Sequence, residues 1–177
     1  MSVFGLIGSD VRAKAEWLYG TSSRSALLKA CVTDGTFAMF AYRFMQWSHR
    51  RRLLPLAMLF NKLNAFFGRC VIGRGAEFGP GFVLIHSYGV VINGAVKGGC
   101  DVRIEHLVTI GAERDTSPVL GDRVFVGAGA KIVGGVTIGD DVKIGANAVV
   151  NKSIPDGATA VGIPAQVVRE REGSGDL

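Results

Sequence analysis

The sequence predicts a mainly β protein built of short stacked strands and preceded by an α-helical region. Two observations carry this prediction. Residues 1–69 hold apolar residues at helical spacing between capping signals, whereas from residue 70 apolar residues followed by glycine recur every six residues. The 177 residues are 48% hydrophobic, enough for one domain with a smaller appendage. The predicted parts are a helical N-terminal domain at 1–69, a β domain at 70–168 and a polar tail at 169–177.

Four segments of the first part have helical patterns. Helices are predicted over 9–19, 23–32, 34–52 and 54–67. Ser9 or Asp10 is the expected N-cap of the first helix. Pro55 suits the first turn of the fourth helix, and Gly68 suits its end. The alternative is one long helix from residue 34 that is kinked at Pro55.

The second part carries a repeat with a period of six residues. Its apolar positions, interrupted by an insertion at 112–118, are Ile72, Phe78, Leu84, Ile104, Ile110, Leu120, Val126, Ile132, Ile138, Ile144 and Val150. Six residues advance a helix by about 600°, so this stripe would not stay on one helical face. In short strands, each of these residues points inward and the small residue after it permits a tight corner. The repeat therefore predicts successive turns of chain, or coils, that share one continuous core.

Positive charge is concentrated in the first part. Residues 1–69 carry ten Lys/Arg and three Asp/Glu, and residues 70–177 carry ten and twelve. A solvated helix face is the favoured interpretation, and no nucleic-acid partner is expected. The run 50–52 is Arg-Arg-Arg and precedes the apolar segment 53–60, so peripheral membrane contact stays open. That segment is too short to span a bilayer.

Cysteine and histidine spacing argues against disulfides and metal. Cys31, Cys70 and Cys100 form no C-x-x-C, and the three histidines lack the spacing of metal ligands. The pattern favours a reducing compartment. The chain does not open on a basic region followed by an apolar one, so no signal peptide is predicted and a cytoplasmic location is expected.

Several motifs of the second part resemble the hexapeptide-repeat acyltransferases. They are HSYG at 86–89, DVRIEHLVTIGA at 101–112, the segment 124–150 and AVGIPAQVV at 160–168. Within that superfamily the chain is most similar to serine O-acetyltransferases and their shorter polysaccharide-modifying relatives. The helical part resembles a truncated helical domain of the serine enzymes. The resemblance implies a left-handed parallel β-helix, acetyl-CoA as co-substrate and no metal. It also implies a homotrimer with active sites between copies, or a hexamer formed through the helical part.

The resemblance implies a histidine base, which falls on His86. Histidine can take the proton of an attacking hydroxyl and later give it to the departing thiolate. His106 lies about one coil further along and is expected in the same site, although a solvent-facing strand residue is the alternative. Acetyl-CoA contacts are implied at Gly111, Ala112, Gly127, Ala128, Gly129 and Ala146. In this family a basic residue usually follows G-x-P-A, but in this chain that position is Gln166. Phosphate contacts are therefore expected at Lys131, Lys152, Arg169 or Arg171 instead.

Three departures separate this chain from the serine enzymes. The aspartate that orients the base falls on Val71, the aspartate before the base on Ile85, and the Arg–His pair that helps hold serine on Thr116 and Ser117. A backbone carbonyl, Glu105 or a neighbouring subunit is left to orient His86. Burying a zwitterion without paired charges is costly, which argues against free serine as the acceptor.

The sequence therefore predicts an acetyl-CoA-dependent O-acetyltransferase acting on a sugar or polysaccharide precursor. The alternatives are a serine O-acetyltransferase with an atypical acceptor site, an N-acetyltransferase of an amino sugar, and a β-helix that lost catalysis and serves as a scaffold. His49, beside the basic run, is expected at the surface.

Overall fold

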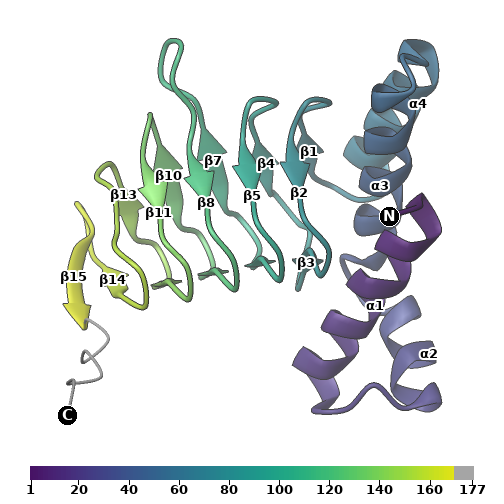
Figure 1. The fold of residues 1–177 in the computed structure, drawn as a ribbon, viewed down its shortest axis with the longest axis horizontal. Coiled ribbons are helices and arrows are strands. Elements are labelled where there is room, and N and C mark those ends of the chain that lie inside the picture. The colour runs from purple at the N-terminus through teal and green to yellow at the C-terminus, as the bar shows by residue number, and fades with distance from the viewer. Residues whose placement is uncertain (170–177) are drawn as a thin grey trace.

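A computed structural model describes residues 1–169 (Figure 1). The helices are α1 (Val3–Tyr19), α2 (Arg24–Val32), α3 (Thr36–Arg50) and α4 (Leu54–Phe66). The strands are β1 (Val71–Ile72), β2 (Glu77–Phe78), β3 (Val83–Leu84), β4 (Val91–Ile92), β5 (Lys97–Gly98), β6 (Arg103–Ile104), β7 (Thr109–Gly111), β8 (Val119–Leu120), β9 (Phe125–Val126), β10 (Lys131–Val133), β11 (Thr137–Ile138), β12 (Lys143–Ile144), β13 (Val149–Val150), β14 (Thr159–Val161) and β15 (Gln166–Arg169). The predicted tail beyond Arg169 and the predicted phosphate contact at Arg171 lie outside the described residues.

The strands form the left-handed parallel β-helix that the sequence predicts. Three sheets make its sides, in the orders β1-β4-β7-β10-β13, β2-β5-β8-β11 and β3-β6-β9-β12-β14, and β15 pairs antiparallel with β14. Figure 1 shows the helices gathered at one end of this column, with β15 at the other. A loop between β7 and β8, at the predicted insertion 112–118, projects from the column (Figure 1).

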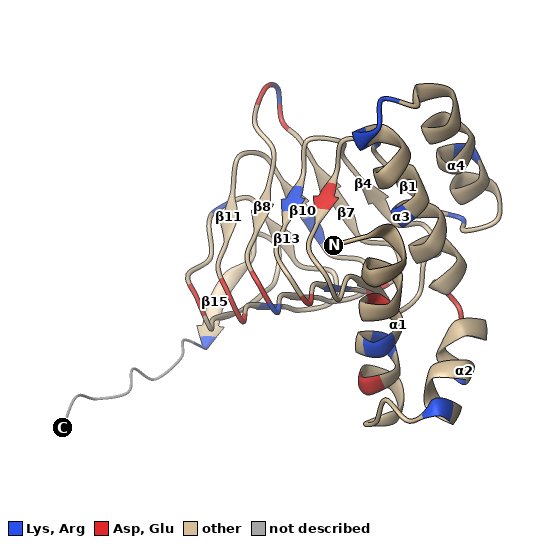
Figure 2. Cartoon of the chain, turned by 45° about the vertical axis from the view of Figure 1, so that its right-hand side comes forward, with Lys and Arg blue, Asp and Glu red and all other residues tan. Residues whose placement is uncertain are grey.

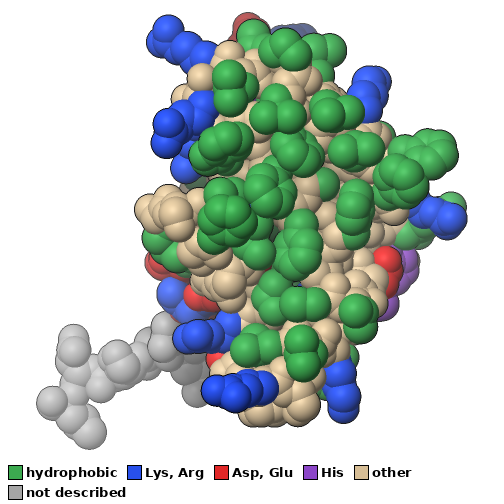
Figure 3. Space-filling view, turned by 90° about the vertical axis from the view of Figure 1, so that its right-hand side faces the viewer, with side chains coloured by type: hydrophobic (Ala, Val, Ile, Leu, Met, Phe, Trp, Pro, Cys, Tyr) green, Lys and Arg blue, Asp and Glu red, His purple; other side chains and the backbone are tan. Residues whose placement is uncertain are grey.

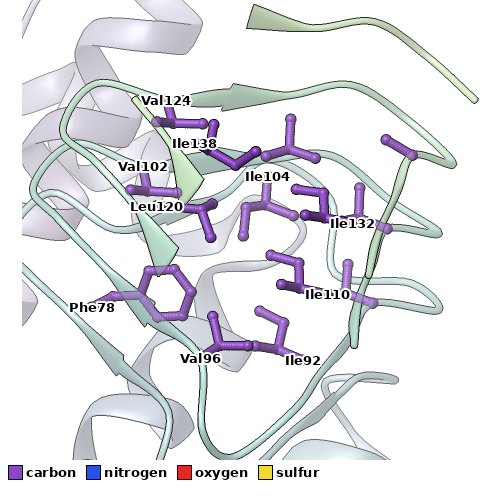
Figure 4. Packing of buried hydrophobic residues seen from close by; sticks show 14 of the residues in the cluster. Phe78, Ile92, Val96, Val102, Ile104, Ile110, Leu120, Val124, Ile132 and Ile138 are labelled. Atoms are coloured by element: carbon purple, nitrogen blue, oxygen red, sulfur yellow. The ribbon is translucent and has the colours of Figure 1, made fainter. Parts of the chain in front are cut away.

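The six-residue repeat supplies the core of the β-helix. Each repeat residue points inward, and Figure 4 shows these side chains in layers, Ile92 beside Ile110 and Ile110 beside Ile132. Burying one such side chain stabilises the fold by about 1.5–3 kcal/mol relative to leaving it exposed. Because every coil buries its aliphatics only against the coils above and below, the two ends of the stack need covers.

The first coil departs from the period of six at one corner. Leu84 and Ile92 are both buried repeat positions but lie eight residues apart, so two extra residues sit between β3 and β4. As a result Leu84 pairs with Ile104, twenty residues later, whereas Ile92 pairs with Ile110 after eighteen. The sequence repeat did not reveal this widened corner, which carries His86.

Helix α1 begins earlier than predicted. Its N-cap is Ser2, whose Oγ accepts a hydrogen bond from the backbone N–H of Gly5. The predicted caps Ser9 and Asp10 lie inside the helix, and Asp10 is fully buried. An early start lets α1 run along β3, where it covers Ile85.

The predicted alternative of one long helix kinked at Pro55 is wrong. α3 ends at Arg50, and the chain reverses through a turn in which Arg52 adopts a positive φ of 60°. Pro55 then sits in the first turn of α4, where its missing N–H costs no hydrogen bond. His49, predicted at the surface, is half-buried and its Nδ1 is enclosed without a hydrogen-bond partner.

A buried ion pair joins the helices to the first coil. Arg43 of α3 donates from Nε to Asp10 Oδ2 at 2.6 Å and from Nη2 to Oδ1 at 2.9 Å, and both side chains are fully buried. Arg43 also donates to the carbonyls of Phe78 and Gly79, while Asp10 accepts the backbone N–H of Phe82. Burial raises the pKa of the Asp10 carboxyl, and the bond to Arg43 opposes that rise. One charge pair therefore ties α1, α3 and β2–β3 together.

Replacing Arg43 by methionine tests this link. We expect Arg43→Met to lower the free energy of unfolding by roughly 3–5 kcal/mol, because Asp10 would remain buried without its cation. Urea unfolding followed by circular dichroism measures the change.

Arg123→Met is the matched control for that variant. Arg123 bonds Asp141 at the exposed edge of the β-helix, and we expect its loss to change stability little. Equal midpoints for the two variants would contradict the structural role of Arg43.

Candidate functional site

The structure brings three ionisable side chains together at the widened corner. His86 Nδ1 lies 3.0 Å from Asp34 Oδ2, and the rings of His86 and His106 are 5.9 Å apart, edge to face. The side chains of His86 and Asp34 are 52% and 59% exposed. His106 Nδ1 lies 3.4 Å from Glu105 Oε2. The corner thus presents a histidine–carboxylate pair to solvent beside a second histidine.

The register of the coils explains why the two histidines meet. Each stands two residues after a buried aliphatic, Leu84 or Ile104, and these two are paired neighbours in β3 and β6. The strand ends there, so the following side chains turn outward at the corner. The one-coil separation that the sequence predicts is therefore present.

Asp34 is the partner of His86 that sequence reasoning missed. It precedes α3 in a turn where Gly35 has a φ of +79°, and its Oδ1 accepts the backbone N–H of Gly35. A Cβ on Gly35 would lie 2.4 Å from the carbonyl oxygen of Leu84, so only glycine lets this turn approach β3. The sequence pattern places Asp34 and Gly35 inside the predicted helix 34–52, whereas α3 begins at Thr36. The closeness of Asp34 to a residue 52 positions later was not visible in the sequence.

A buried lysine holds the Asp34 turn against the β-helix. Lys14 of α1 donates from Nζ to the backbone carbonyls of Asp34 and Leu84, the latter at 2.9 Å. The side chain is fully buried, and burial lowers its pKa from the ordinary 10.5 to about 8. Lys14 therefore fixes the segment that carries Asp34 to the strand that leads to His86.

Small residues continue the corner below the histidines. The paired positions, here called the histidine column, are His86, His106, Ala128, Ala146 and Gly162. Backbone hydrogen bonds join successive coils beside this column; for example, the N–H of Gly129 donates to the carbonyl of His106. The column therefore places an open, narrow strip of backbone next to the two imidazoles.

Gly127 and Gly129, two of the predicted cofactor contacts, have structural reasons to be glycine. A Cβ on Gly127 would lie 2.7 Å from the backbone nitrogen of Ala146, and Gly129 has a φ of +73°. Ala130, the last residue of the GAGA segment, belongs to the core. Of this segment, only Ala128 has no such constraint and stands in the histidine column.

The remaining predicted contacts lie elsewhere on the coil. Ala112 and Lys152 follow the paired residues Ile110 and Val150 by two positions, so they occupy the corner at the opposite end of β7 and β13. Gly111 pairs with Val133 at that same end. Lys131 lies between the two corners on β10 and donates to the carbonyl of Leu107. One chain by itself divides the predicted acetyl-CoA contacts between two corners.

A hollow of ≈ 220 Å³ opens beside the histidine–carboxylate pair. Its lining, here called the acceptor hollow, consists of Asp34, Phe67, Gly68, Arg69, Ser87 and Tyr88. Its residues carry one carboxylate, one guanidinium, two hydroxyl groups and two aromatic rings. The Arg69 guanidinium lies 6.0 Å from the centre of the Tyr88 ring. The hollow therefore offers both signs of charge, and its carboxylate is the one that contacts His86.

The three sequence departures have structural counterparts. Val71 is an exposed residue of β1, and Ile85 is buried beneath Ala13 of α1, which leaves no room for a solvated carboxylate. Thr116 bonds the carbonyl of Glu113 within the projecting loop. Glu105 contacts Nδ1 of His106. The prediction that Glu105 could orient His86 is wrong, because Asp34 is the carboxylate that contacts Nδ1 of His86.

The described residues hold no site for a metal. Among residues 1–169 no group of three or more His, Cys, Asp and Glu side chains could hold an ion. Burial raises the pKa of the Cys70 thiol to about 12, so this cysteine is not an activated nucleophile.

Comparison with known proteins identifies close relatives. Residues 117–152 match the family described as bacterial transferase hexapeptide (six repeats). A serine acetyltransferase of Helicobacter pylori is 43% identical over 138 residues, with 76% of this chain and 81% of that protein covered. A serine acetyltransferase structure in complex with CoA is 29% identical, with a TM-score of 0.86 over 94% of this chain and 70% of the other. A structure of a serine acetyltransferase of Neisseria gonorrhoeae in complex with serine is 29% identical, with a TM-score of 0.82 over 93% of this chain and 68% of the other.

The lowered pKa of Lys14 predicts a pH-dependent contribution to stability. Between pH 8 and 10.5 the unfolded chain binds more protons at this residue than the folded chain, so stability rises with pH. From pH 8 to pH 10 we expect the unfolding free energy of the wild type to gain about 2 kcal/mol relative to Lys14→Met. Taking the difference between the two proteins cancels the titration of every other group. A pH-independent difference in urea unfolding would contradict the burial of a titrating ammonium.

Proposed function

Because this chain belongs to the serine acetyltransferase family of hexapeptide-repeat proteins, we propose that it transfers the acetyl group of acetyl-CoA to the hydroxyl of L-serine. The observation that carries the proposal is the exposed His86–Asp34 pair beside His106 at a corner lined by small residues. A non-catalytic scaffold, the predicted alternative, does not account for a histidine–carboxylate pair that is exposed to solvent. No contact in the described residues favours N-acetylation of an amino sugar.

His86 acts as the general base of the reaction. With Nδ1 donating to Asp34, its Nε2 is left to accept the proton of the serine hydroxyl as the oxygen attacks the thioester carbonyl. The new C–O bond forms, the C–S bond breaks, and the proton passes from Nε2 to the departing thiolate. Asp34 fixes the ring and its tautomer and stabilises the imidazolium that forms in between.

The acceptor hollow suits a small zwitterion. Asp34 keeps lone pairs for an ammonium group, and Arg69 can pair with a carboxylate, each opposite in charge to its partner on serine. The sequence argument against serine assumed that charges must stand at Ile85, Thr116 and Ser117. The helical part and the segment after α4 supply them from different positions.

The sugar or polysaccharide acceptor that the sequence favours has no support among the relatives. Those described above are serine acetyltransferases, and one of them is in complex with serine. The serine alternative therefore replaces the glycan interpretation.

The two separated corners favour an assembly of several copies. Acetyl-CoA, when bound, supplies the activated acetyl group as a thioester. Ala128 and Ala146 of the histidine column can accept its thin arm, whereas Lys131, Lys152 and Ala112 lie toward or at the other corner. A cleft between two copies would join one corner of each, as in the predicted trimer. This agrees with the modest volume of the acceptor hollow, ≈ 220 Å³, which fits serine and not CoA.

An acceptor panel tests the function. Purified protein is given acetyl-CoA with L-serine, with D-serine, and with nucleotide sugars or oligosaccharides, and release of free thiol is followed. We expect turnover with L-serine, reduced about 10²–10⁴-fold in His86→Ala because the base is lost. Turnover with a sugar and none with serine would overturn the acceptor. Unchanged turnover in His86→Ala would overturn the mechanism.

Asp34 and Arg69 are predicted to differ in their effect on kcat. Asp34→Asn should lower kcat roughly tenfold or more, because the amide cannot stabilise the imidazolium, and should also raise the KM for serine, because Asp34 is proposed to pair with the ammonium group. Arg69→Gln should raise the KM for serine and leave kcat nearly unchanged, because Arg69 only binds the acceptor. Lys143→Gln, on an exposed strand of the β-helix, is the control and should change neither constant. Equal effects of both variants on kcat would contradict this division of roles.

A further inference from the structure

Helix α4 is apolar on both sides, and its inward side buries Ala57 and packs Phe60 against the core. The side that packs on the protein contains asparagines: Asn61 donates to the carbonyl of Ile72 at 2.7 Å, and the buried Asn64 donates to the carbonyl of Ala38. The outward side is hydrophobic. Its members, here called the apolar face, are Leu54, Pro55, Met58, Leu59 and Phe66. Their side chains lie in solvent although ordinary burial would favour the reverse.

The exposure of the apolar face is large. Met58 and Leu59 are 51% and 52% exposed, and Phe66 is 77% exposed. Figure 3 shows hydrophobic side chains spread across the whole helical end of the molecule, with Lys and Arg side chains around the edge. Contiguous exposed apolar area of this kind marks a surface that meets a partner or a membrane.

The charge around the apolar face has a single sign. Residues 35–76 contain no Asp or Glu and six exposed Lys/Arg, at 50, 51, 52, 62, 69 and 74; Arg43 is buried, and Arg50 lies 3.9 Å from the exposed Glu77. Figure 2 shows blue segments but no red ones on α3 and α4. Arg51 and Arg52 are exposed at the turn that leads into α4, and Lys62 stands on the outward side of α4 among the apolar residues. The partner of this surface must therefore be anionic.

A second hollow lies beside this turn. It measures ≈ 430 Å³ and runs between α1 and α3, with Phe4, Leu6 and Trp47 among its apolar lining and Arg50 and Arg51 at its basic side. Phe4 contacts Phe44, which stacks on Phe60 of α4, so the hollow is continuous with the helical end. An apolar floor beside two guanidinium groups fits the phosphate and upper acyl chain of an anionic lipid.

We propose that the apolar face and the Arg50–Arg52 turn bind the surface of an anionic phospholipid membrane. The apolar side chains enter the headgroup region, and the Arg and Lys side chains pair with lipid phosphates. The protein lies on the membrane and does not cross it, since no helix among the described residues is long and apolar enough to span one.

A second copy of the chain is the competing occupant of this surface. A two-fold interface would set the same basic patch against itself, and Glu77, which already lies 3.9 Å from Arg50, is a single carboxylate that cannot pair with all the exposed cations at 50, 51, 52, 62, 69 and 74. A bilayer rich in anionic lipid supplies both the apolar interior and the missing negative charge. Charge complementarity therefore favours the membrane over self-association through α4.

Vesicle co-sedimentation tests the proposal. The full chain is mixed with vesicles of phosphatidylcholine alone and with vesicles containing one third phosphatidylglycerol. We expect binding to the anionic vesicles only, weakened by salt. Arg51→Gln with Arg52→Gln should weaken it about 25-fold, since each charge near the surface is worth about fivefold. Met58→Gln with Phe66→Gln should also abolish most binding.

Matched variants on the β-helix serve as controls. Val119→Gln with Val168→Gln removes two exposed apolar residues, and Lys97→Gln with Lys143→Gln removes two exposed charges far from α4. Neither pair should change binding, and acetyl transfer in solution should be unchanged in all four variants. Absence of vesicle binding would overturn the proposal. So would a mass in light scattering that falls in Met58→Gln/Phe66→Gln, because the face would then belong to a second copy.

Discussion

The buried pair of Arg43 and Asp10 is the contact on which the rest of the structure depends. An open β-helix exposes the unpaired edges and side chains of its first coil, and the helical part covers that end. The two charges are tolerated in the interior because their other polar atoms are also hydrogen-bonded. Arg43 donates to backbone carbonyls of the first coil, and Asp10 accepts a backbone N–H there. Such directional bonds set the angle of the helices on the coil, which apolar packing alone would leave adjustable.

That angle has a consequence for the chemistry. With α1 fixed along β3, Lys14 reaches the carbonyls of Asp34 and Leu84, and the turn before α3 comes close enough to bond His86. The corner that carries the proposed catalytic residues is thus assembled from two parts of the chain. The β-helix aims the histidines, and the helical part provides the carboxylate. A serine acetyltransferase relative that lacks an aspartate at Val71 can keep an oriented base by this route.

The helical end also has a surface of its own. Its inward contacts combine apolar packing with specific hydrogen bonds, whereas its outward side is apolar and basic. Phe67, which follows α4, lines the acceptor hollow, so the proposed membrane surface adjoins the site of acetyl transfer. Binding and catalysis would then share one end of the molecule without sharing residues that move protons.

The sequence by itself determined the stacked coils and the position of the core, since a period of six residues is a local signal, and its resemblance to a family singled out the two histidines that the structure brings together. It placed the start of α1 wrongly because Asp10 looks like a cap when its partner 33 residues away is unknown. It missed Asp34 for the same reason, and with it the charges that suit serine. Only the tertiary structure decided these contacts, because they join residues far apart in the chain. Their geometry follows from how two folded parts pack together, and no local pattern encodes that.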